Sequence, residues 1–177
     1  FGAKFGRHIE ELLVSPMPNW VILAGYVAGA VLRGLMVGGI VMVIALLFTD
    51  VRVAHPLITL TTVLLGATIF ALAGFLNAVY AKKFDDIAIV PTFILTPLTY
   101  FGGVFYSITL LPGWAQAATH ANPIFYMVNA FRYGLLGMSD VPLLTAYVLM
   151  IGFVVALSAL GLFLLNSRIL RIVWIIF

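Results

Sequence analysis

The sequence of 177 residues contains no cysteine and few charged side chains. Lys, Arg, Asp and Glu make up 8% of the residues, whereas about 25% is usual in a soluble domain. A soluble fold of this size needs more polar side chains to cover its surface, so lipid must serve as the solvent. The lack of cysteine excludes a disulfide framework, a thiolate metal site and a thiol nucleophile. These absences exclude a soluble globular protein and predict a membrane domain.

Motifs for catalysis are absent as well. The sequence has no G-x-x-x-x-G-K-[ST] phosphate loop, no H-E-x-x-H and no G-x-S-x-G, and its three histidines lie far apart. No run of basic residues interleaved with aromatics indicates nucleic-acid binding. We therefore expect no catalytic residue, no metal or cofactor bound by this chain, and no nucleic-acid partner. Asp85 and Asp86 are adjacent, which suits the cap of a following helix better than an acid–base pair.

Long apolar runs dominate what is present, since 64% of the residues are hydrophobic and the mean hydropathy is +1.20. About 20 apolar residues in a helix cross a bilayer core of about 30 Å. Four ranges meet this length: 20–48, 57–80, 87–106 and 142–165. The third only just reaches it and contains Pro91 and Pro97, which bend a membrane helix. The sequence therefore predicts an all-α polytopic membrane bundle in a single domain, 1–177.

The segment of about 111–137 has a different pattern. Asn122-Pro123 divides it into two short amphipathic pieces, and neither is long enough to span a bilayer. Its aromatic side chains are typical of the headgroup level of a membrane. We predict that the two pieces are half-depth helices that form a re-entrant or interfacial hairpin.

The nine Lys and Arg residues predict the orientation of the spans through the positive-inside rule. If the chain starts in the cytoplasm and the hairpin does not cross, six of them lie inside: Lys4, Arg7, Lys82, Lys83, Arg168 and Arg171. A hairpin that crossed the membrane would place the last two outside. The pattern favours four spans, an external hairpin and both visible ends in the cytoplasm.

Arg33 lies near the middle of the first predicted span. An arginine at this depth costs about 2.5–3.5 kcal/mol on insertion scales. It can therefore line a translocation path or a polar contact between subunits. Alternatively, the span starts later or tilts, and the guanidinium reaches an interface. The two interpretations are equally supported by the sequence.

Residues of about 7–15 have apolar side chains at Ile9, Leu12 and Leu13 with polar ones between them, which is the spacing of an amphipathic helix. Ser15-Pro16 ends this helix before the first span. Such a helix on the cytoplasmic side can dock a soluble partner, or it can be a plain interfacial anchor. The residues alone favour the anchor.

Several short motifs together resemble the type-2 ABC permease family. They are Ile9-Glu10-Glu11-Leu12-Leu13-Val14-Ser15-Pro16, Pro97-Leu98-x-x-x-Gly102-Gly103-Val104-Phe105-Tyr106-Ser107, Leu111-Pro112, Asn122-Pro123 and Arg132-Tyr133-Gly134. Their combination is specific and covers nearly the whole chain, although each motif alone is weak. The resemblance implies six spans per subunit, so we expect two spans before Phe1. It also implies a bacterial inner-membrane exporter, in which a homodimer of permease chains works with two ATPase chains that bind ATP and Mg.

The resemblance also implies roles for individual residues. A cytoplasmic coupling helix would dock on the ATPase through Glu10, Glu11, Leu12, Leu13 and Ser15. The external hairpin would be a re-entrant gate that contains Pro112, Trp114, Asn122, Pro123, Tyr126 and Arg132. No role follows for Arg33, and the apolar tail 172–177 departs from the polar, basic ending that the resemblance implies.

We therefore predict a permease subunit of an ATP-binding cassette exporter that uses ATP hydrolysed by a separate partner, and not an enzyme. The alternative is an ion- or proton-coupled secondary transporter or channel. That class would need acidic residues within the spans and an inverted repeat, and the sequence shows neither. An intramembrane enzyme would need a catalytic cluster at depth, and none is visible.

Overall fold

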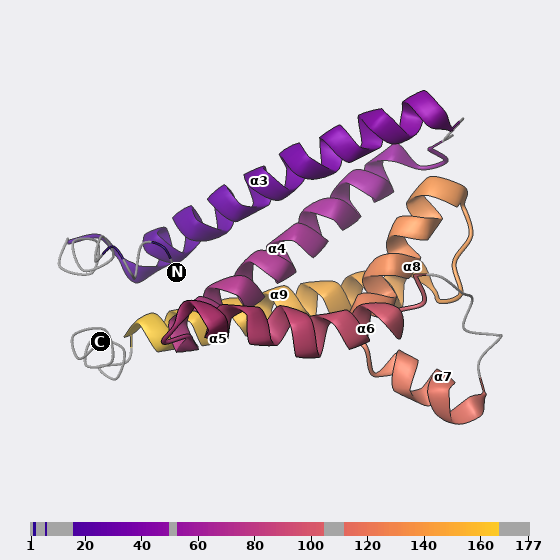
Figure 1. Cartoon of the computed structure of the whole chain (residues 1–177). Coiled ribbons are helices and arrows are strands. Elements are labelled where there is room, and N and C mark those ends of the chain that lie inside the picture. Colours follow the sequence, from indigo (N-terminus) through magenta and orange to yellow (C-terminus); the bar gives the residue numbers. More distant parts are fainter. Residues whose placement is uncertain (1, 3–5, 7–15, 50–52, 105–111, 167–177) are drawn as a thin grey trace.

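The computed structural model describes residues 2, 6, 16–49, 53–104 and 112–166. Within these ranges all regular elements are helices, so the predicted all-α class is confirmed. Figure 1 shows them as long rods that lie side by side, with two short helices gathered near one end. The predicted coupling helix, with Glu10, Glu11, Leu12, Leu13 and Ser15, lies outside the described residues, as does the apolar tail 172–177.

Three helices are long and apolar enough to cross a membrane: α3 (Asn19–Phe48), α4 (Pro56–Tyr80) and α9 (Leu143–Asn166). The shortest of them has 24 residues, which corresponds to about 36 Å at about 1.5 Å per residue. None contains an acidic residue. Each begins and ends within one residue of an apolar run in the sequence, because the backbone of such a run can satisfy its polar groups in lipid only as a helix.

The fourth apolar range is divided into consecutive short helices: α5 (Phe84–Ile89), the π-helix η1 (Val90–Leu95) and α6 (Thr96–Tyr100). The N–H and hydroxyl of Thr96 both donate to the carbonyl of Pro91, five residues earlier. The wider π turn is needed because the Pro97 ring would crowd a carbonyl in a regular α-helical turn. Together the three helices are about 25 Å long, slightly less than a bilayer core of about 30 Å.

The sequence predicts that Asp85 or Asp86 caps the helix that follows. Lys83 is the N-cap residue of α5, and Asp86, at the third helical position, completes a capping box. Its carboxylate accepts the backbone N–H groups of Lys82 and Lys83 at 2.9 and 3.0 Å, which fixes the first turn of α5. These two hydrogen bonds also hold the pKa of the Asp86 carboxyl below its usual range. The side chain of Asn77 donates to the Ile87 carbonyl at 3.0 Å and joins the end of α4 to α5.

Two apolar clusters hold the bundle together. One joins α4, α9 and the short helix α8 (Pro123–Leu136), and consists of Ile69, Met127, Ala130, Ala146 and Met150. The other joins α3, α4 and α9 and consists of Leu23, Leu72 and Leu165. A Cβ atom at Gly161 would lie 3.4 Å from Leu23, so glycine brings α9 close to α3 there.

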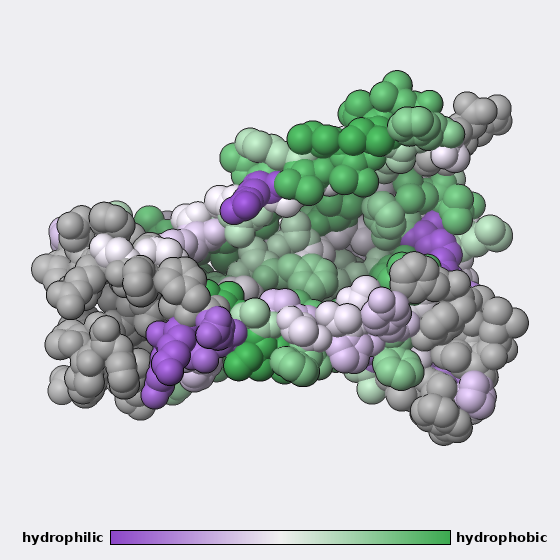
Figure 2. All heavy atoms as spheres, viewed as in Figure 1, coloured by the Kyte–Doolittle hydropathy of each residue, from purple (hydrophilic) through white to green (hydrophobic). Residues whose placement is uncertain are grey.

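The outer surface of the bundle is apolar. Figure 2 shows strongly hydrophobic residues over the C-terminal half of α3, whereas its first half is less hydrophobic. Leu47, Phe48 and Leu144 keep 78, 85 and 77% of their surface exposed. An apolar surface of this extent is not stable in water, whereas lipid chains can cover it.

The two ends of the bundle differ. At one end, the side chain of Asn19 donates to the side chain of Asn166 at 3.2 Å, so α3 begins where α9 ends. At the other end, which we call the hairpin end, the His55 N–H donates to the Gly134 carbonyl at 2.8 Å and the Ala54 N–H donates to the Leu135 carbonyl at 3.0 Å. The helix α8 therefore packs at the end of the bundle opposite to Asn19 and Asn166.

Candidate functional site

Two short helices follow the third apolar segment: α7 (Gly113–His120) and α8. With 8 and 14 residues, they are about 12 and 21 Å long, and neither reaches across a bilayer. In Figure 1 they form a V at the hairpin end, whose point lies toward the bundle. Pro112 is exposed just before α7, and Trp114 lies in the first turn of α7.

The point of the V is the Asn122-Pro123 turn, in which Asn122 is buried. The Asn122 side-chain oxygen accepts the Ile124 N–H at 3.0 Å and caps α8, while Pro123 occupies the first helical position. The Asn122 side-chain nitrogen donates to the Leu98 carbonyl at 2.5 Å. In a continued α-helix the Leu98 carbonyl would accept the Gly102 N–H, four residues later. The Gly102 N–H donates to the Thr99 carbonyl instead, so the Leu98 carbonyl is left for Asn122. Asn122 therefore both starts α8 and attaches it to α6.

Aromatic side chains hold α7 against α8. The Tyr126 hydroxyl donates to the His120 carbonyl at 2.8 Å. The ring of Phe125, which is completely buried, lies edge-to-face with the rings of His120 and Tyr126 at 5.4 Å in each case. These contacts fix the angle between the two helices.

The outer end of α8 lies very close to the start of α4. A Cβ atom at Gly134 would lie 2.9 Å from the backbone nitrogen of Thr59 and 3.0 Å from its Cα, so only glycine fits. The ring of Tyr133 stacks on His55 at 5.1 Å. The α8 helix then ends at Gly137, whose φ of 72° turns the chain back toward α9.

Arg132 connects α8 to two other segments. One guanidinium nitrogen donates to the Gly103 carbonyl at 2.6 Å, and another donates to the Asp140 carboxylate at 3.1 Å. The Asp140 N–H in turn donates to the side-chain oxygen of the fully buried Asn129 at 3.0 Å. We call Arg132, Asp140, Asn129 and the Gly103 carbonyl the Arg132 network. It ties the hairpin to the chain after α6 and to the chain before α9.

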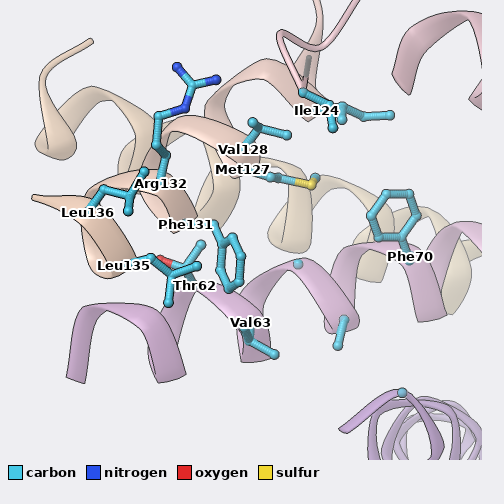
Figure 3. A pocket seen from close by; sticks show the side chains of 14 residues that line it. Thr62, Val63, Phe70, Ile124, Met127, Val128, Phe131, Arg132, Leu135 and Leu136 are labelled. Carbon is cyan, nitrogen blue, oxygen red and sulfur yellow. The ribbon is translucent and has the colours of Figure 1, made fainter. Parts of the chain in front are cut away.

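A cavity of about 700 Å³ lies beside this network, between α3, α4 and α8. Figure 3 shows Phe70 of α4 and Met127 and Phe131 of α8 around it, with the guanidinium of Arg132 at its edge, directed away from α4. The lining is apolar apart from Thr62 and Arg132. The Thr62 hydroxyl lies 3.1 Å from the Tyr147 hydroxyl, within hydrogen-bond distance.

The six predicted gate residues thus lie in or beside one hairpin, and the structure gives contacts to Asn122, Tyr126 and Arg132 in particular. The gating role itself stays a prediction. The sequence did not single out Asp140 and Asn129 as partners of Arg132. Asp140 lies beyond the end of α8, so no helical spacing indicates the pair, and Gly137 was the only local signal of the turn that brings them together.

Arg33 lies apart from this hairpin network. It is exposed on α3, and among the described residues it has no hydrogen bond or ion pair. Its neighbour Gly34 lines the cavity. Among the described residues there is also no group of His, Asp and Glu that could hold a metal ion.

Comparison with known proteins gives a consistent result. The family described as ABC-2 type transporter matches residues 3–136. The inner membrane transport permease YadH of Escherichia coli K12, of E. coli O157:H7 and of Shigella flexneri is in each case 57% identical over 156 residues, which is 88% of this chain. The chain spans 61% of the length of these relatives. No solved structure matches. With its long apolar helices and this sequence similarity, the chain belongs to the ABC-2 type transporter family and is a multi-pass inner-membrane protein.

Proposed function

We propose that the chain is the membrane-spanning part of an exporter permease that works as a homodimer with two separate ATPase subunits. Membership of the ABC-2 type transporter family and the transport permeases among its relatives support this proposal. The lack of a phosphate loop in these 177 residues also supports it, because ATP and Mg would then be bound by the partner subunits.

The hairpin is the external gate in this proposal. The observation that carries it is the attachment of the hairpin to the third apolar segment, through Asn122 to Leu98 and through Arg132 to Gly103. A movement of α6 or of the chain just after it would be transmitted to α8 through these two hydrogen bonds. The gate would then open or close with the spans and needs no covalent chemistry.

The driving force comes from the partners. ATP must bind the closed arrangement of the ATPase subunits more tightly than the open one, and only this difference can shift the spans between their states. The predicted coupling helix, with Glu10, Glu11, Leu12, Leu13 and Ser15, would carry the movement from the ATPase to α3. In this orientation both visible ends face the cytoplasm.

An ion- or proton-coupled transporter is less well supported. The described acidic residues are Asp85, Asp86 and Asp140, and all of them lie at the ends of helices or in turns. A proton-coupled mechanism needs ionisable groups at depth in the spans.

Substitution of both Glu10 and Glu11 by Ala tests the coupling. A single cysteine in place of the exposed Leu136 of α8 can report on the gate, once any cysteine outside these cysteine-free 177 residues has been replaced by serine. In the full-length protein reconstituted with its ATPase, we expect ATP to change the rate of thiol labelling at this position. The double substitution should abolish the change while ATP hydrolysis continues.

Lys82→Ala is the control, since it removes a charge from the turn between α4 and α5, which lies outside the predicted coupling helix of about 7–15 in the sequence. It should leave the ATP-dependent labelling unchanged. A double Glu variant that still shows the full ATP-dependent change would contradict the proposed coupling role.

A further inference from the structure

The cavity between α3, α4 and α8 has the chemistry of a site for an apolar chain. Glycine and alanine make the space: a Cβ atom at Gly34 or Gly66 would meet nothing within 4 Å, and Ala67 lies beside them. The larger lining residues are aliphatic or aromatic. The Thr62 hydroxyl already has Tyr147 within hydrogen-bond distance, so the cavity wall offers little to a polar molecule.

One end of the cavity is bordered by the guanidinium of Arg132, whose charge is paired with the Asp140 carboxylate at 3.1 Å. The side chain of Arg132 keeps 22% of its surface exposed. A guanidinium has five N–H donors, and the described contacts of Arg132 to Gly103 and Asp140 use two of its nitrogens. Further N–H groups can therefore bind an anion such as a phosphate in the manner usual for arginine.

The depth of these features matches the shape of a lipid. Arg132 lies at the hairpin end of the bundle, whereas the lining residues of α4 run inward from Thr62 to Phe70. The nine residues from Thr62 to Phe70 span about 12 Å along the axis of α4, which is within the range that an acyl chain occupies below its headgroup. The cavity lies between spans whose outer surfaces are apolar, so a lipid can enter it from the membrane.

We propose that this cavity binds one acyl chain of an anionic phospholipid, with the lipid phosphate at Arg132. The site lies within a single chain, and it requires neither a second copy nor the ATPase. It is therefore independent of the export proposal and can be present or absent whatever drives transport.

The test is photolabelling of the full-length protein in phosphatidylcholine vesicles, without ATP. Two probes carry the same photoreactive diazirine in the acyl chain, one on phosphatidylglycerol and one on phosphatidylcholine. We expect the phosphatidylglycerol probe to label peptides of α4 and α8 that line the cavity, and to do so several-fold more than the phosphatidylcholine probe.

Gly66→Leu fills the cavity, and Gly74→Leu is its matched control. Both glycines lie in α4 with nothing within 4 Å of a Cβ atom, but Gly74 is outside the cavity lining. Gly66→Leu should reduce the labelling about tenfold, as expected when about two methylene groups of the chain lose their apolar contact. Gly74→Leu should label like the natural sequence. If Gly66→Leu fails to fold, Ala67→Phe fills the same space and replaces it.

Three results would overturn the proposal. The first is equal labelling by the two probes, which would remove the role of Arg132. The second is uniform labelling of all exposed helices with no effect of Gly66→Leu, which would indicate lipid contact without a site. The third is no labelling of the cavity in the full-length protein, which would mean that another protein segment or a second copy fills it.

Discussion

Arg132 joins segments that are far apart in the sequence, and its shape explains why arginine is needed. The guanidinium donates in two directions at once, to the Gly103 carbonyl and to the Asp140 carboxylate. A lysine ammonium cannot reproduce this planar fork. Because the pair with Asp140 is about one-fifth exposed on each side, its energy is modest, and the geometry matters more than the charge.

Substitution of Arg132 by Gln is expected to loosen the hairpin. The loss of the ion pair and of the charged hydrogen bond to Gly103 should destabilise α8 by about 1–2 kcal/mol. Amide hydrogen exchange in α7 and α8 should therefore be about 5–30-fold faster. Arg33→Gln serves as the control, since Arg33 has no described polar contact, and it should leave this exchange unchanged. Unaltered protection of α8 in the Arg132 variant would show that the network does not hold the hairpin.

At the scale of the elements, the sequence predicted some features well and others poorly, for physical reasons. The bounds of α3, α4 and α9 follow from apolar runs, because the part of a helix that lies in the bilayer core must be apolar along its whole length. The prolines of 87–106 indicated a bend, but the π-helix depends on how the Thr96 N–H and the Pro91 carbonyl meet, which composition does not specify. The partners of Arg132 depend on the direction of the turn at Gly137 and on packing between distant helices.

Packing of α8 on α4 depends on the absence of a side chain at Gly134. Gly134→Ala would place a methyl group against the backbone of Thr59, so α8 must move outward. We expect a loss of about 1–3 kcal/mol, the usual cost of overpacking, and a lower midpoint of thermal unfolding in detergent.

Gly152→Ala in α9 is the matched control for this change, because a Cβ atom there meets nothing within 4 Å. It should leave the midpoint unchanged or raise it slightly, since alanine favours helix over glycine. Equal midpoints for the two variants would argue against the close approach of α8 to Thr59.

For the whole molecule, composition and charge predicted a membrane bundle whose hairpin does not cross. This topology stays a prediction. In the described chain, α3 starts beside the end of α9 through the contact of Asn19 with Asn166. Lys82 and Lys83 follow α4 and precede α5 at that same end, whereas Arg132 lies at the hairpin end. The cavity could not be predicted, because most of its wall comes from three helices and only their packing brings Gly34, Gly66 and Met127 around one space.

The central claim is that the chain acts with a separate ATPase, and co-purification tests it most directly. The tagged full-length protein is extracted from its own membrane in mild detergent, and its partners are identified by mass spectrometry. We predict that an ATPase chain with a phosphate loop is retained, one for each permease chain, and that the purified complex hydrolyses ATP. Recovery of an intact permease with no ATPase chain and no ATP hydrolysis would contradict the account.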